Sequence, residues 1–177
     1  MSWLSRLKAA RGGAQALSAQ AEHTLRTWHA LPDAVLDHPH FESRYVVVNT
    51  EATGLDLDSD RLLAVGAVGV DGGLLHPTDA YYATLDPAPG EALAGLLGVV
   101  GKSPLVVFNA SFNRSMLERA LNEHLGLVPS FVWIDLYFLL PSLFPEKRDR
   151  PGRLADWMAA FGIETFQRHH ALGDAWA

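Results

Sequence analysis

The spacing of apolar and polar residues along this chain changes near residue 44. Before it, apolar side chains recur at helical spacing over residues 3–30, with an interruption at Gly12 and Gly13. After it, short β-branched runs alternate with helical stretches, which is typical of an α/β domain. We therefore expect an N-terminal helical arm over residues 1–43 and an α/β domain over residues 44–177.

In the second region the pattern predicts a sheet covered by helices. Strands are expected at residues 45–48, 62–70, 80–85, 105–108 and 131–134. Helices are expected at residues 92–100, 112–125, 136–144, 154–161 and from about residue 171 onward. Asp71, Gly72 and Gly73 signal a hairpin turn between the second and third strands. Three strands in hairpin order, followed by strands that alternate with helices, predict a mixed five-stranded sheet.

The composition narrows the class of protein. With 177 residues, 49% of them hydrophobic, the chain is long enough for a full core, and it has no cysteine for disulfides or thiolate metal sites. A formal net charge of −6 argues against broad basic surfaces, but is compatible with a nuclease that meets phosphate through carboxylate-held metal ions. The N-terminus lacks the apolar core of a signal peptide, and no apolar stretch approaches the roughly 20 residues of a membrane span. We expect a cytoplasmic protein with no membrane partner.

Three segments place polar side chains at the boundaries of predicted elements. The first follows the strand at residues 45–48, the second joins the strand at 105–108 to a helix, and the third closes the chain. Their candidate site residues are Asn49, Glu51, Thr53, Gly54 and Leu55, then Asn109, Phe112 and Asn113, and finally His169 and Asp174. Since α/β folds bind ligands at the ends of their strands, these segments favour one functional site.

These segments resemble the three motifs of the DEDDh exonuclease family, which includes the proofreading epsilon subunit of bacterial DNA polymerase III, ribonuclease T and oligoribonuclease. In that family the motifs read Asp-x-Glu-Thr-Thr-Gly, Asn-x-x-Phe-Asp and His-x-x-x-x-Asp. Glu51, His169 and Asp174 match, whereas Asn49 and Asn113 stand where the family has aspartates. The resemblance implies a ribonuclease H-like fold and a 3′–5′ exonuclease that acts on the 3′ end of single-stranded DNA or RNA.

The resemblance also implies a two-metal mechanism. Two Mg²⁺ or Mn²⁺ ions about 3.5–4 Å apart would activate the attacking water and stabilise the leaving oxygen. The metal ligands carried over by position are Asn49, Glu51, Asn113 and Asp174, with His169 as the general base. The residues expected to contact the terminal nucleotide are Thr53, Gly54, Leu55, Asn109 and Phe112.

The two asparagines weaken the implied metal site. An amide has the size of a carboxylate but no charge, so four converging carboxylates become two. We expect one weak metal site near Glu51 and Asp174, and severely reduced or absent catalysis. Isosteric changes of this kind arise either from engineering of an inactive variant or from natural drift into a non-catalytic role. The alternative function is a catalytically silent module that binds nucleic acid or docks a protein partner.

Several of these residues also have a structural interpretation. Glu51 is compatible with a cap on a helix or turn. Asp135, which ends the fifth predicted strand, is either a site carboxylate or the N-cap of the following helix. Taken without the other motifs, His169 and His170 would be surface residues before a helix. With those motifs, His169 is the expected base and His170 is expected to point away from the site.

The sequence leaves two interpretations for each of two further regions. The basic run at residues 147–150, with Arg153, is either a solvated loop or a phosphate contact. The apolar face of the N-terminal arm, with Trp3 and Trp28, either packs on the domain or docks a protein partner. Substrate binding is also expected to be weaker than in the family. Ala52 replaces a motif threonine, and only three residues follow Asp174 where the family has a long helix.

Overall fold

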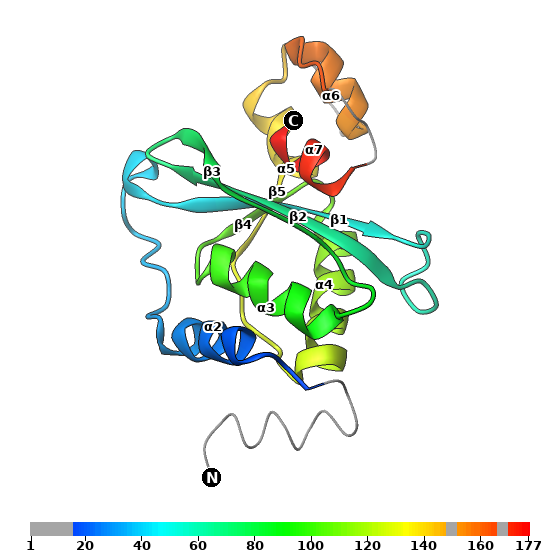
Figure 1. Cartoon of the computed structure of the whole chain (residues 1–177). Coiled ribbons are helices and arrows are strands. Elements are labelled where there is room, and N and C mark those ends of the chain that lie inside the picture. Colours follow the sequence, from blue (N-terminus) through cyan, green and yellow to red (C-terminus); the bar gives the residue numbers. More distant parts are fainter. Residues whose placement is uncertain (1–15, 148–151, 166–169) are drawn as a thin grey trace.

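A mixed five-stranded sheet forms the centre of the computed structural model, which describes residues 16–147, 152–165 and 170–177 (Figure 1). The strands are β1 Tyr45–Ala52, β2 Leu62–Asp71, β3 Leu74–Thr84, β4 Leu105–Val107 and β5 Trp133–Asp135. They lie in the order β3-β2-β1-β4-β5. β1, β2 and β3 pair antiparallel, whereas β4 and β5 continue the sheet in parallel from β1. The predicted sheet is confirmed.

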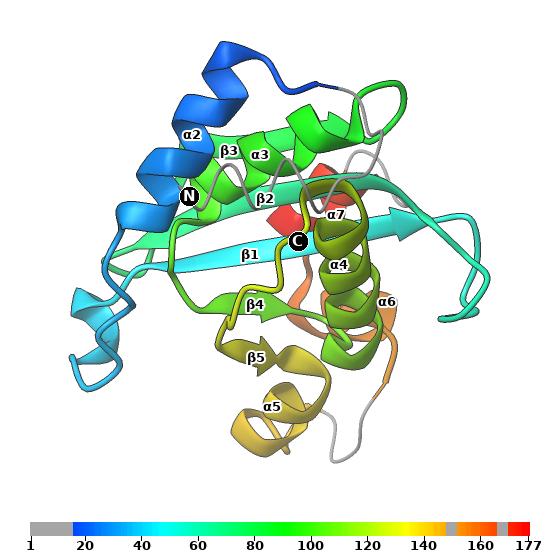
Figure 2. The ribbon, with the colours of Figure 1, turned by 90° about the horizontal axis from the view of Figure 1, so that it is seen from below.

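Helices cover both faces of this sheet. They are α2 Ala19–Ala30, α3 Pro89–Val100, α4 Ala110–Leu125, α5 Leu136–Leu143, α6 Leu154–Phe161 and α7 Ala171–Trp176, with a short 3-10 helix η1 at His40–Glu42. α3 and α4 lie on one face with α2 packed outside α3, while α7 and α6 lie on the other face (Figures 1 and 2). Among the described residues, no helix has both the length and the apolar character needed to cross a membrane.

The described part of the N-terminal arm packs on the body of the protein. Ser18 caps α2 by accepting a hydrogen bond from the backbone N–H of Ala21. Ala21, Leu25 and Trp28 are buried in the same core as the apolar residues of α3, as the helical spacing predicted. The indole N–H of Trp28 also donates to the carbonyl of Gly101 at 2.7 Å. The packing interpretation is therefore confirmed for α2, whereas the part of the predicted helix before residue 16 lies outside the described residues.

Some element boundaries differ from the prediction for local reasons. β3 begins at Leu74 instead of residue 80, because Gly72 and Gly73 take positive φ angles of 58° and 75° and turn the chain directly from β2 into β3. α3 begins at Pro89 instead of residue 92, because the fixed φ of proline suits the first position of a helix. α4 begins at Ala110, since Asn109 serves as its N-cap.

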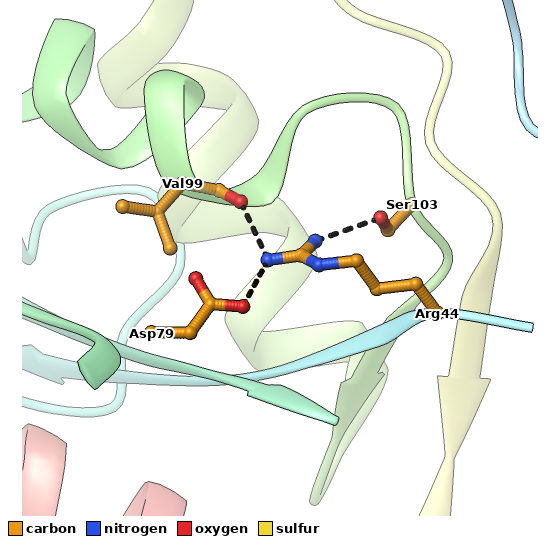
Figure 3. A network of polar contacts seen from close by, with 4 residues as sticks. All are labelled: Arg44, Asp79, Val99 and Ser103. Atoms are coloured by element: carbon orange, nitrogen blue, oxygen red, sulfur yellow. Dashed lines mark hydrogen bonds and ion pairs between the residues drawn. The ribbon is translucent and has the colours of Figure 1, made fainter. Parts of the chain in front are cut away.

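The end of the sheet where β1 begins is held by a polar network around Arg44 (Figure 3). The guanidinium donates to the Ser103 hydroxyl at 2.9 Å, to the Asp79 carboxylate at 2.7 Å and to the Val99 carbonyl at 3.0 Å. A Cβ on Gly69 would collide with the Asp79 carboxylate and displace it from Arg44, so the bare backbone of β2 makes room for this ion pair. This network joins β1, β3 and α3, and leaves the opposite end of β1 open for a site.

Candidate active site

A cleft of about 850 Å³ opens where β1 and β4 end, and it gathers most of the predicted site residues. Those that line it are Asn49, Glu51, Gly54, Leu55, Asn109, Phe112, Asn113 and Asp174. Thr53 is not among the cleft-lining residues that the structure describes. His169, the expected general base, lies outside the described residues. The three sequence motifs thus converge on one cleft.

The cleft is built from both faces of β1, because successive strand residues point to opposite sides of a sheet. Thr50 faces α4, where its hydroxyl donates to the Oδ1 atom of Asn113 at 2.9 Å. Glu51 faces α7, where its Oε1 atom accepts a hydrogen bond from the backbone N–H of Ala171. Asn113 and Asp174 therefore come from opposite faces of the sheet and both line the cleft at the end of β1.

Asn113 is a buried amide that donates both of its N–H hydrogens and accepts one hydrogen bond. Its side chain is 3% exposed. The amide nitrogen donates to the carbonyl oxygens of Phe108 at 2.9 Å and Asn109 at 3.1 Å, while the amide oxygen accepts from Thr50. A carboxylate has no hydrogen to donate, so an aspartate at this position would face two carbonyl oxygens without a donor. The connection between β4 and α4 is thus folded around an amide.

Asp135 supports the same connection from the neighbouring strand. Its carboxylate accepts from the backbone N–H of Tyr137 at 2.9 Å, which confirms the predicted N-cap of α5. The same carboxylate accepts from the N–H groups of Asn109 at 3.0 Å and Ala110 at 2.8 Å, at the start of α4. Asn109 itself has a left-handed φ of 70°. Asp135 is not among the described cleft-lining residues, so it acts as a cap that positions two walls of the cleft.

α7, which carries Asp174, has two of its N–H groups capped by side chains and packs on the sheet at two places. Glu51 caps its first N–H group, at Ala171. The Nδ1 atom of His170 accepts from the Gly173 N–H at 3.3 Å, and the His170 ring stacks on Tyr82 of β3. A Cβ on Gly66 of β2 would lie 2.4 Å from the Ala171 backbone, so the helix rests directly on the strand. His170 therefore contacts β3 rather than the cleft.

The loop after β1 is ordered by its own aspartates. The Thr53 hydroxyl donates to Asp60 at 2.6 Å and accepts from the Arg61 N–H at 3.1 Å. The Arg119 guanidinium of α4 donates to the carbonyls of Leu57 and Asp60. Thr53 was expected to contact the nucleotide, but its hydroxyl is used inside the loop. Its role as a substrate contact stays a prediction.

Within this loop, Asp56 is stabilised as a carboxylate. Hydrogen bonds from the backbone N–H of Asp58 at 2.9 Å and of Ser59 at 3.2 Å lower the pKa of Asp56 below its ordinary value. Leu55, which precedes it, is 84% exposed and lines the cleft. The loop therefore presents an apolar side chain to the solvent at the edge of the cleft.

The donor set of the cleft does not fit two metal ions. Glu51 and Asp174 are the family-motif carboxylates that line it, and Asn49 can add one amide oxygen. A third carboxylate of the lining, Asp156, is paired with Arg153 at 3.7 Å. The amide oxygen of Asn113 already accepts a hydrogen bond from Thr50. The described part of the chain contains no group of three or more His, Cys, Asp or Glu residues placed to hold a metal ion. These oxygens suit one hard divalent ion at most.

The sequence motifs did not point to every residue of the cleft. Phe108, Tyr137, Arg153 and Asp156 also line it. Phe108 follows β4 directly and Tyr137 comes soon after β5, so their position at strand ends was the available signal. Of the basic run, Arg153 is in the cleft wall, whereas Lys147 turns to α6 and donates to the Ala160 carbonyl at 3.0 Å. Residues 148–151 lie outside the described residues.

Comparison with known sequences gives two distant relatives. No protein-family model matches the chain. It is 27% identical over 157 residues to the PolC-type DNA polymerase III of Thermotoga maritima, and 27% identical over 154 residues to that of Thermotoga petrophila. The alignments cover 76% and 74% of this chain, but the chain spans only 11% of the length of either polymerase.

Solved structures give a likeness of fold. Exonuclease I superposes with a TM-score of 0.56 at 17% identity, over 76% of this chain and 39% of that protein. A zinc-bound form of the E. coli exonuclease I complex with single-stranded DNA superposes with a TM-score of 0.57 at 17% identity, over 76% of this chain and 38% of that protein. The sheet and its flanking helices are thus the ribonuclease H-like fold of exonuclease I. The motifs, the fold and the polymerase relatives together relate this chain to the DEDD-type 3′–5′ exonucleases.

Proposed function

We propose that this chain is a 3′–5′ exonuclease domain that binds the 3′ end of single-stranded nucleic acid in the cleft, and whose two-metal hydrolysis is severely impaired. The observation that carries the proposal is the hydrogen bonding of Asn113. Its amide stands where the family's second motif has an aspartate, and both of its hydrogens are donated to backbone carbonyls. The cleft therefore keeps the fold of a nuclease without the charge that the two-ion reaction requires.

The walls of the cleft support binding of a nucleotide. Leu55, Phe108 and Phe112 offer apolar surface for a base, and Asn49 offers an amide to a sugar or phosphate. Several solved exonuclease I structures hold a single strand, among them the E. coli enzyme with a dT13 oligonucleotide. By analogy with that fold, the ligand of this chain would be a single strand of DNA or RNA entered by its 3′ end.

One divalent ion, Mg²⁺ or Mn²⁺, would be held by the carboxylates of Glu51 and Asp174 and by the side-chain amide oxygen of Asn49. When bound, such an ion polarises a phosphate oxygen and neutralises part of its charge. Glu51 also accepts from the Ala171 N–H, so its carboxylate would be shared between the ion and the helix. His169 is the proposed general base, since it stands at the histidine position of the family's third motif, five residues before Asp174. Metal binding in this cleft is expected to be weak.

The alternative is a catalytically silent module that keeps the fold to bind nucleic acid or a protein partner. Two observations favour it. The hydrogen bonds of Asn113 need an amide, so the surrounding backbone is adapted to the residue that is present. The Glu51 carboxylate already has a structural use as the cap of α7. In this alternative, restoring charge to the cleft does not restore hydrolysis.

The test separates binding from cleavage. Affinity for a single-stranded oligonucleotide is measured by fluorescence anisotropy, with a 3′-phosphorylated oligonucleotide as the matched control for recognition of the 3′ end. Cleavage is followed with a 5′-labelled strand in Mn²⁺ for the wild type, Asn49→Asp, and Asn49→Asp combined with Asn113→Asp. We expect the wild type to bind the free 3′ end and to cleave slowly or not at all.

Recovery of stepwise 3′–5′ shortening in Asn49→Asp would support the exonuclease, because this change restores a charge without disturbing Asn113. In that background, Glu51→Gln should abolish shortening, and His169→Ala should lower its rate by roughly 10²–10⁴-fold, as for a lost general base. Continued silence of every restored variant with retained binding favours the silent module. Absence of binding by the wild type to DNA and RNA alike would overturn the proposal.

A further inference from the structure

We infer that Phe108, Tyr137 and Phe138 form a row of aromatic rings on which the bases of a single strand stack as the strand leaves the cleft. The inference rests on the proposed binding of a 3′ end, and it assigns the path of the nucleotides that follow. Phe108 and Tyr137 line the cleft, while Phe138 lies outside it on α5. The row thus begins in the cleft and ends on the surface.

The rings are in direct contact. The ring centroids of Phe108 and Tyr137 are 5.9 Å apart with the planes at 83°. Those of Tyr137 and Phe138 are 5.0 Å apart with the planes at 87°. Each ring therefore meets the next one edge to face, which is a favourable geometry for aromatic pairs. The outer ring, Phe138, therefore contacts Tyr137 on its inner side, while 64% of the residue stays exposed to solvent.

The exposure of the outer ring needs an explanation, because α5 is short and strongly apolar. No residue of α5 is buried, and Phe138 is 64% exposed. Leu139 and Leu143 on the same helix are exposed as well. Single exposed apolar residues are normal, but an exposed ring joined through two ring contacts to a cleft is not explained by packing. A ligand that continues from the cleft along the rings would cover it.

Charge favours stacking as the source of affinity along this path. The chain has a formal net charge of −6, and Arg153 is the cation among the described residues that line the cleft. Arg153 also lies 3.7 Å from the Asp156 carboxylate, which offsets part of its charge. A strand held by few phosphate contacts must gain its affinity from its bases, and every base has a face that stacks on an aromatic ring.

The experiment compares a thymidine dinucleotide with a thymidine dodecamer, in Ca²⁺ to limit hydrolysis. Phe138→Ala is expected to lower the affinity for the dodecamer by at least about five-fold, the loss of one stacked base, and to leave the affinity for the dinucleotide unchanged. Phe138→Tyr keeps a ring and should bind the dodecamer as the wild type does. Leu143→Ala, an exposed apolar change on the same helix, is the matched control and should have no effect.

The salt dependence gives a second readout. The logarithm of the binding constant falls with the logarithm of the salt concentration at a slope of about −0.7 per phosphate contact. If stacking supplies the affinity, the measured slope should correspond to few contacts. Phe138→Ala should leave that slope unchanged. If the wild type binds and Phe138→Ala has the same affinity as the wild type for both ligands, the aromatic row is overturned but the proposed function is not. An equal loss in Leu143→Ala overturns it too, since a general apolar surface would explain the result. A wild type that binds neither ligand overturns the proposed function instead.

Discussion

The imidazole ring of His170 stacks on the phenol ring of Tyr82, with 4.5 Å between the centroids and 24° between the planes. The same imidazole caps α7 by accepting from the Gly173 N–H. α7 carries Asp174, a residue of the cleft, while Tyr82 lies on the edge strand β3. A strand that does not reach the cleft therefore contributes to the position of one of its carboxylates.

This stacked pair should be measurable as a coupling energy. His170→Ala and Tyr82→Ala are each expected to lower the free energy of unfolding by roughly 1 kcal/mol, with a coupling of about 0.5–1.5 kcal/mol in a double-mutant cycle. Urea denaturation gives these values. Tyr82→Phe keeps the ring and should restore most of the loss. The control is a second cycle on His40 and Tyr45, whose rings lie 5.0 Å apart. Loss of this second pair should not affect ligand binding. Additive losses for His170 and Tyr82 would contradict the pairing.

Asn113→Asp should destabilise the protein. The substitution removes two donated hydrogen bonds and sets a carboxylate against the carbonyls of Phe108 and Asn109. We expect a loss of roughly 2–4 kcal/mol in the free energy of unfolding at neutral pH, since a buried unpaired charge costs more than a neutral group. Urea denaturation at several pH values measures it.

The pH dependence of that loss distinguishes charge from packing. Burial would raise the pKa of the new carboxyl, so the folded state favours its protonated form and the loss should shrink as the pH falls. Asn49→Asp, at a less buried position of the same cleft, is the matched control and should cost less. A loss for Asn113→Asp that is independent of pH would show that shape and not charge is responsible.

Divalent metal should bind weakly and at one site. Titration calorimetry with Mn²⁺ is expected to give a stoichiometry of at most one ion, because Glu51 and Asp174 are the two motif carboxylates of the cleft. Glu51→Gln should abolish the heat of binding, and Asn49→Asp should strengthen it by adding a charge. Asp79→Asn, in the Arg44 network at the other end of the sheet, is the control that should leave it unchanged. Two ions bound at full occupancy would contradict this expectation.

Asp56 should contribute stability that depends on acid pH. Backbone hydrogen bonds from Asp58 and Ser59 lower the pKa of Asp56 in the folded state. Its contribution is therefore complete above the ordinary aspartate pKa of about 3.9, and is lost as the pH falls through the lower folded value. When the pH is lowered from 5 to about 2.5, the free energy of unfolding measured by urea denaturation should fall less for Asp56→Asn than for the wild type. Asp58→Asn keeps the N–H donor and should behave as the wild type.

The local pattern of the sequence predicted the elements, but not the contacts between them. α6 begins and ends where the helical spacing indicated, and β1 and β2 begin at the expected residues, 45 and 62. Strand ends also located Asn49 and Glu51 in the cleft. The hydrogen bond between Thr50 and Asn113 joins residues 63 positions apart, and no local rule fixes such a pair.

The aromatic residues in and around the cleft were missed for a related reason. Tyr137 and Phe138 belong to an apolar run that reads as a buried helix, whereas α5 lies at the edge of the sheet and buries none of its residues. Tyr82 reads as an ordinary strand residue until β3 and α7 come together. Propensity and spacing describe one segment at a time, and these roles arise from the arrangement of several.

The carboxylate of Asp135 accepts hydrogen bonds from the first residues of both α4 and α5. Asn113 stands in the first turns of one helix and Tyr137 in the first turn of the other. Any tilt of α5 that opens the aromatic side of the cleft must therefore stretch the bonds that also orient Asn113. The half-buried carboxylate of Asp135 thus links the start of α4 to the start of α5, so a ligand that moves α5 outward also acts on the helix that carries the second motif.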